Sequence, residues 1–172
     1  MTFISKTISN PAYTIFLVVS LMLFTGTTKA EDKTKIAENF TLKSQRGENI
    51  KLSELRGKFV LLSFWSSQCG TCIKQFSNLN KFHAQFSAKG LSILAINVGD
   101  NFQKITQIRK KFKPKFSLLF DQYSTVSAAY DIESLPSYFL IDRDGNIQRK
   151  FNAENLNDSK TTQTIIQGLL DE

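Results

Sequence analysis

An apolar run leads into a pair of cysteines in the segment Phe59-Val-Leu-Leu-Ser-Phe-Trp65-Ser-Ser-Gln-Cys69-Gly-Thr-Cys72. The near-continuous apolar character of residues 59–65 is typical of a strand that is covered on both faces of its sheet. Apolar residues at helical spacing follow, so the pattern predicts a helix over residues 70–88. Cys69 then lies at the N-terminus of this helix, where unpaired backbone N–H groups and the helix dipole favour a thiolate.

The two cysteines are the only ones in the chain, and they are three residues apart. Such a pair can exchange disulfides with a partner, because the Cys69 thiolate can attack and Cys72, one turn further on, can resolve the mixed disulfide. A zinc site is one alternative, but zinc takes about four ligands and the chain adds only one histidine, His83. A structural disulfide is another, although so short a bridge would constrain little of the unfolded chain. We therefore interpret the pair as redox-active, with no metal and no cofactor.

The first 30 residues differ in character from the rest of the chain. Lys6 precedes a short apolar core over residues 13–24, and Thr28-Lys-Ala30 offers small residues on the N-terminal side of a cleavage site. We interpret residues 1–30 as a signal peptide. An uncleaved membrane anchor is the alternative, although a spanning helix needs about 20 apolar residues. Either interpretation places residues 31–172 outside the cytoplasm, in the periplasm or an equivalent compartment, and a membrane contact is expected only if the segment stays uncleaved.

The chain is basic: 22 Lys and Arg against 15 Asp and Glu give a net charge of +7 at pH 7. Much of the excess lies in Arg109-Lys-Lys-Phe-Lys-Pro-Lys115. This segment could attract an acidic partner or an anionic membrane surface, or it could be the solvated end of a helix whose dipole favours cations. No nucleic-acid-binding motif accompanies it, so we expect no nucleic-acid partner.

The remaining pattern alternates strands with helices. Two short strands over residues 40–43 and 50–52 predict a hairpin ahead of the central strand. Further strands are expected over residues 91–98, 116–120, 138–141 and 147–151, with helices over 102–112, 124–130 and at the C-terminus. With 172 residues and 41% hydrophobic content, the chain can form one α/β domain, a mixed sheet flanked by helices.

The spacing of apolar residues also predicts which faces of the two long helices are buried. The predicted inner positions are Ile73, Phe76, Leu79, His83 and Phe86 in the first helix, and Phe102, Ile105, Ile108 and Phe112 in the second.

A second motif, Leu135-Pro136 ahead of Tyr138-Phe-Leu-Ile-Asp142, completes a resemblance to a known family. Together with Phe40-Thr-Leu, Gly57-Lys58, Phe64-Trp65 and Cys69-x-x-Cys72, this motif resembles the TlpA/ResA-like thiol-disulfide oxidoreductases of the thioredoxin superfamily. The resemblance covers residues 40–172. It implies a thioredoxin-like fold over residues 31–172, with an extra N-terminal β-hairpin and a central insertion.

The resemblance also implies the parts of the site. A cis Leu135-Pro136 bond is expected beside the cysteines, with the Leu135 backbone pairing to a bound substrate strand. The catalytic residues would be Cys69 and Cys72, and the substrate-binding residues Trp65, Gly70, Thr71, Leu135 and Pro136.

The chain departs from the family pattern around the cysteines. Gln68 and Thr71 stand where members often have Trp and Pro, while Ser63 and Gln75 stand where many have Asp or Asn and Glu. Because neither of these positions carries a carboxylate, we expect Cys72 to exchange its proton through water or a hydroxyl group. Only the helix terminus visibly favours the Cys69 thiolate, which favours a reductant or a moderate exchanger over a strong oxidant.

The leading interpretation is an extracytoplasmic thiol-disulfide oxidoreductase that acts on proteins and depends on a membrane or periplasmic redox partner. A peroxiredoxin-type peroxidase is an alternative, for which Ser66 fits the expected pattern but Leu62 occupies the position of a required proline. A non-catalytic thioredoxin-like binding module is the other alternative. Its copper-carrying form would need a distal histidine that this chain lacks.

Overall fold

The computed structural model describes residues 35–154 and 159–171. Residues 1–30, which we predict to be a signal peptide or an anchor, lie outside the described residues. Within the described part, no helix combines the length and the apolar character needed to cross a membrane.

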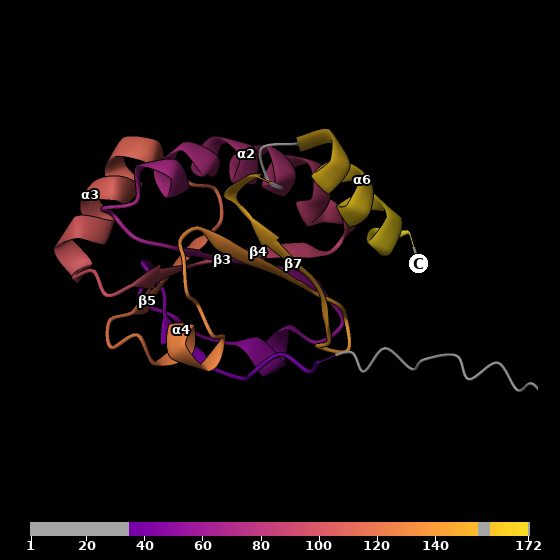
Figure 1. Cartoon of the computed structure of the whole chain (residues 1–172), viewed down its shortest axis with the longest axis horizontal. Helices are drawn as coiled ribbons and strands as arrows, with labels where there is room; N and C mark the ends of the chain where they lie inside the picture. Colours follow the sequence, from indigo (N-terminus) through magenta and orange to yellow (C-terminus); the bar gives the residue numbers. More distant parts are fainter. Residues whose placement is uncertain (1–34, 155–158, 172) are drawn as a thin grey trace, which may run out of the picture. The chain divides into compact units, whose positions relative to one another are not determined.

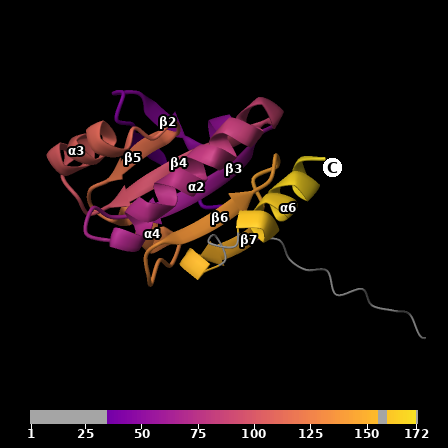
Figure 2. The same ribbon diagram turned by 90° about the horizontal axis from the view of Figure 1, so that it is seen from above.

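A five-stranded mixed sheet with the order β5-β4-β3-β6-β7 forms the centre of the domain (Figure 2). β3 (Phe59–Trp65) lies in the middle, parallel to β4 (Leu91–Val98) and antiparallel to β6 (Ser137–Ile141). β5 (Ser117–Asp121) extends the parallel side, and β7 (Ile147–Asn152) extends the antiparallel side. Every residue of β3 is buried, which confirms the prediction of a central strand covered on both faces.

Helices and a small hairpin cover the two faces of this sheet (Figure 1). One face carries α2 (Gly70–Phe86), which continues into η2 (Ser87–Lys89), together with α3 (Phe102–Phe112) and α6 (Ser159–Leu170). The other face carries the hairpin of β1 (Thr41–Lys43) and β2 (Asn49–Lys51), η1 (Leu52–Leu55) and α4 (Thr125–Ala129). The predicted hairpin and flanking helices are thus present, whereas the central insertion stays a prediction.

Aromatic side chains fill the core on both faces of the sheet. Beneath α2, Phe76 packs edge-on against Trp65, with ring centroids 5.0 Å apart. On the opposite face, Tyr130 packs against Phe64 and donates its hydroxyl hydrogen bond to the carbonyl of Glu38 at 2.7 Å. Burial, with a smaller effect of Glu38, raises the pKa of Tyr130, so the hydroxyl remains protonated as a donor. This bond ties the N-terminal arm to the core.

The buried faces of the long helices differ from the sequence prediction at three positions. Phe82, which the predicted stripe omitted, is fully buried, whereas His83 next to it is only half-buried. Phe102 was predicted to face inward and is 59% exposed. It is the first residue of α3 and lies against the half-buried ring of Phe120, with centroids 5.1 Å apart, so the core side of α3 begins later, at the fully buried Ile105.

Asp142 organises the turn between β6 and β7. Its carboxylate accepts hydrogen bonds from the backbone N–H groups of Asp144 and Asn146 at 3.0 and 2.8 Å, and from the side-chain amides of Asn146 and Gln148 at 3.0 and 2.7 Å. Burial by itself would raise the pKa of Asp142, but these hydrogen bonds outweigh it and lower the pKa below its ordinary value.

We expect Asp142→Asn to lower the free energy of unfolding at pH 7 by about 1–3 kcal/mol, because an amide cannot accept all four hydrogen bonds. The pKa of the carboxyl in the unfolded chain is about 3.9, above that in the folded protein, so its stabilisation is fully present above about pH 4 and is lost as the pH falls through the lower folded value. Urea unfolding at a series of pH values measures this effect. A difference between wild type and variant that stays constant down to acid pH would contradict it.

Candidate active site

Cys69 and Cys72 form a disulfide at the N-terminus of α2. Cys69 is the N-cap residue, and its Sγ accepts a hydrogen bond from the backbone N–H of Cys72 at 3.1 Å. The backbone N–H of Cys69 in turn donates to the carbonyl of Ser66 at 3.2 Å, which closes a turn ahead of the helix. Cys69 is half-buried and Cys72 is 1% exposed, so Cys69 is the sulfur that a visiting molecule can reach.

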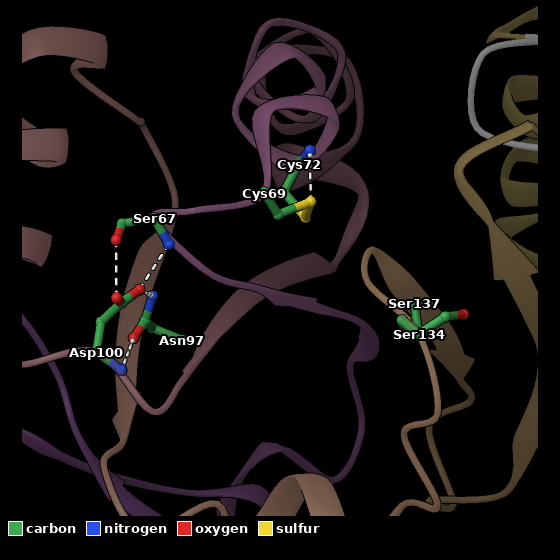
Figure 3. The surroundings of a disulfide bond; sticks show 7 residues. All are labelled: Ser67, Cys69, Cys72, Asn97, Asp100, Ser134 and Ser137. Carbon is green, nitrogen blue, oxygen red and sulfur yellow. Dashed lines mark hydrogen bonds between the residues drawn. A yellow bond between two sulfur atoms is a disulfide. The ribbon is translucent and has the colours of Figure 1, made fainter.

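The Leu135-Pro136 loop lies at the same end of the sheet as the cysteines. Phe64, next to the last residue of β3, pairs with Ser137, the first residue of β6, so the loop before β6 meets the loop after β3. The Leu135-Pro136 bond is cis, in agreement with the resemblance. The Ser137 hydroxyl donates to the carbonyl of Ser134 at 2.8 Å, and Figure 3 shows both residues in the surroundings of the disulfide. Leu135 belongs to the same hydrophobic cluster as the two cysteines.

The other predicted substrate-binding residues divide into two groups. Gly70 and Thr71 are exposed in the first turn of α2, where they border the disulfide in sequence. Trp65 differs from the expectation of direct contact, because it is 0% exposed and packs beneath the helix with Phe76. Trp65 therefore supports the cysteine loop from within the core.

The sequence prediction missed Asp100, in the loop between β4 and α3. Its carboxylate accepts hydrogen bonds from the Ser67 backbone N–H at 2.5 Å and from the Ser67 hydroxyl at 2.7 Å (Figure 3). Asn97 adds a hydrogen bond from its side-chain amide at 2.8 Å, and the Lys104 ammonium lies 3.9 Å from the carboxylate. The one available signal in the sequence was the polar pair Asp100-Asn101, which is separated by one residue from the end of the buried strand β4.

The buried Asp100 is an anion at neutral pH. Burial by itself would raise its pKa, but hydrogen bonds from Asn97 and Ser67, with a smaller contribution from Lys104, lower the pKa below its ordinary value. The loop that presents Cys69 is thus held by a charged acceptor.

The two positions where the resemblance leads us to expect an acidic or amide side chain are buried. Ser63 is 1% exposed and Gln75 is 3% exposed. Tyr138 lies opposite Ser63 in the neighbouring strand, and burial raises the pKa of its hydroxyl. Tyr138 lies in the same core cluster as Cys72, and the exchange of the Cys72 proton through water or a hydroxyl group stays a prediction.

A hollow of about 560 Å³ lies on the hairpin side of the sheet and includes Phe40, Asp100 and Tyr130 among its lining residues. Neither cysteine lines it. The disulfide lies at the end of the sheet where the loop after β3 meets the loop before β6.

Residues 34–150 match the model of the AhpC/TSA family. The chain belongs to this family. It is 35% identical to the thiol-disulfide oxidoreductase ResA of Bacillus subtilis over 111 residues, which are 64% of this chain and 62% of that protein. It is 30% identical to a ResA of Bacillus cereus over 139 residues, which are 79% of this chain and 80% of that protein.

A solved structure supports the same assignment. The crystal structure of a candidate thiol:disulfide interchange protein DsbE from Chlorobium tepidum has a TM-score of 0.76 at 29% identity, covering 81% of this chain and 98% of that one. This AhpC/TSA-family chain is therefore a thiol-disulfide oxidoreductase of the ResA/DsbE type with a thioredoxin-like fold, and its Cys69–Cys72 pair fits that activity.

In the reduced protein, we expect iodoacetamide to modify Cys69 at least about tenfold faster than Cys72, because Cys69 is accessible and lies at a helix N-terminus. Cys72→Ser reports the rate of Cys69, Cys69→Ser reports the rate of Cys72, and mass spectrometry measures both. The same variants in urea provide the control, since the two rates should converge once the helix is lost. Equal rates in the folded variants would contradict the expectation.

Proposed function

We propose that this oxidoreductase reduces disulfide bonds in protein substrates outside the cytoplasm. The observation that carries the proposal is the asymmetry of the cysteine pair, with Cys69 accessible at the helix N-terminus and Cys72 buried behind it. The composition of residues 1–30 supports the extracytoplasmic location.

The reaction proceeds by two thiol–disulfide exchanges. The Cys69 thiolate attacks one sulfur of the substrate disulfide, so that a mixed disulfide forms and the second substrate sulfur leaves as a thiolate. Cys72, after losing its proton, attacks the Cys69 sulfur and expels the first substrate sulfur. The Cys69–Cys72 disulfide of the structure is the product, and two electrons have passed to the substrate. A redox partner, in the membrane or the periplasm, must then return two electrons through its own thiols.

The surface around Cys69 supports docking of an extended protein segment. Gly70 and Thr71 are exposed on one side, and a Cβ built at Gly70 would meet no atom within 4 Å. On the other side Leu135 is half-buried beside the buried Pro136. We assign the backbone of Leu135 to pair with the substrate chain, so that main-chain hydrogen bonds hold substrates of varied sequence.

Two features support the reducing direction. Neither Gly70 nor Thr71 carries a charge, so the helix terminus alone stabilises the Cys69 thiolate within the motif. The Lys104 ammonium near this loop already lies 3.9 Å from the Asp100 carboxylate, so it adds little stabilisation to a Cys69 thiolate. In a strong oxidant the dithiol form is specially stabilised. A dithiol without such stabilisation gives up its electrons more readily.

The proposal is tested with Cys72→Ala, which keeps the attacking thiol and removes the resolving one. Incubated with disulfide-bonded periplasmic proteins, this variant should accumulate mixed disulfides that dithiothreitol reverses. Cys69→Ala is the matched control and should trap at least about tenfold less, because the remaining thiol is buried. Trapping that does not depend on Cys69 would refute the proposal.

Two further measurements separate the alternative functions. A peroxidase would consume hydrogen peroxide at a rate dependent on the cysteines, with no mixed disulfide to a protein. A binding module would retain its partners after Cys69 and Cys72 are both replaced by serine. We expect the wild-type protein to reduce insulin disulfides with dithiothreitol as electron source, and the double variant to lose this activity.

A further inference from the structure

We propose that Asp100 is a positioning residue for the exchange reaction, which sets where the Cys69 sulfur lies relative to Cys72. The proposal rests on the proposed role of Cys69 as the attacking residue. Asp100 does not bond to either cysteine among the hydrogen bonds described. It acts through Ser67, which lies two residues before Cys69 and is bound through both its backbone N–H and its hydroxyl.

The Asp100 carboxylate is itself fixed to the central sheet. Asn97 donates its side-chain amide to Asp100 Oδ2 at 2.8 Å and accepts the Asp100 backbone N–H at 3.2 Å. Asn97 is fully buried and pairs with Trp65, the last residue of β3. Ser67 is therefore held in place by the ends of the paired strands β3 and β4. Its position does not depend on its own loop alone.

The connection from Ser67 to the reactive sulfur is short. Gln68 is the only residue between Ser67 and Cys69, and the Cys69 backbone N–H is bonded to the carbonyl of Ser66. A displacement of Ser67 therefore moves the N-cap of α2 and the sulfur that it carries. Displacements of about 1 Å at a reacting group can change rates by roughly 100-fold.

A carboxylate suits this position better than an amide. Asp100 Oδ2 accepts from the Ser67 backbone and from Asn97, while Oδ1 accepts from the Ser67 hydroxyl and faces Lys104. An Asn side chain presents only one oxygen, so one pair of donors would lose its acceptor. The cysteines form a disulfide in the structure, and the bonds from Asp100 hold the Cys69 loop in that geometry, so Asp100 favours the disulfide form of the pair over the dithiol.

The test measures the equilibrium of the Cys69–Cys72 pair with glutathione. We expect Asp100→Ala to make the pair more oxidising by about tenfold in the equilibrium constant, or about 30 mV. Asp100→Asn keeps the shape and removes the charge, and should shift the constant about threefold. Ser67→Ala keeps the charge and the backbone bond, and should shift it about twofold. The rate at which Cys72 displaces glutathione from Cys69 should fall in the same order.

Asp142→Asn is the matched control, because Asp142 is also a carboxylate with several hydrogen-bond donors. It follows Ile141, which pairs with Val60 at the far end of β3 from Cys69. Its variant should lose stability and leave the glutathione equilibrium unchanged. If the equilibrium constant with glutathione shifts as much in this control as in Asp100→Asn, the effect of Asp100 is one of general stability, and the proposal is overturned.

An equilibrium for Asp100→Ala that matches wild type would also overturn the proposal. If Asp100→Ala does not fold, Asp100→Asn and Ser67→Ala decide the question, and wild-type values for both would refute it. Because the equilibrium is a property of the cysteine pair itself, these outcomes do not depend on whether the protein traps a substrate through Cys69.

Discussion

The burial of β3 on both faces is the constraint on which the site depends. A strand covered by helices on one side and by the hairpin and α4 on the other cannot continue past its last apolar residue without burying unpaired polar backbone. After Trp65 the chain therefore leaves the sheet in a tight turn, and the helix that follows must cover the face it has just left. Cys69 occupies the N-cap of that helix. Its sulfur is therefore accessible because the helix must begin outside the sheet before it packs on the core.

The same constraint gathers the other loops of the site. β4 is parallel to β3 and ends beside it, so the loop that carries Asp100 emerges at the end of the sheet where the cysteines lie. β6 is antiparallel to β3 and begins there, which brings in the segment ending at Pro136. Ser67 and Asp100 are 33 residues apart in the sequence, and the cysteines and the Leu135-Pro136 loop are more than sixty apart. The direction and register of the strands alone make these segments neighbours.

Local patterns made much of this fold predictable from the sequence. The central strand, β4 and α3 have the predicted bounds because each is a continuous apolar or periodic run with clear ends. The placement of Pro136 came from a resemblance, since nothing in its immediate sequence requires a cis bond. Phe102 was misassigned because a periodic pattern does not show where a helix leaves the core. Asp100 was missed as a site residue because its partner Ser67 is specified by strand register, which single-sequence periodicity does not report.

The arrangement of polar groups around the cysteines differs from one built on a buried carboxylate under the helix. Ser63 and Gln75 place no charge beneath α2, and the charged acceptor described beside the Cys69 loop is Asp100, in the wall of the loop outside the helix. A carboxylate beneath the helix can take part in proton transfer with Cys72, whereas one bonded to Ser67 acts on the position of Cys69. Its effect therefore falls on the attacking sulfur. We expect the resolving sulfur to exchange its proton through water or a hydroxyl group, and burial keeps the nearby Tyr138 hydroxyl protonated by raising its pKa.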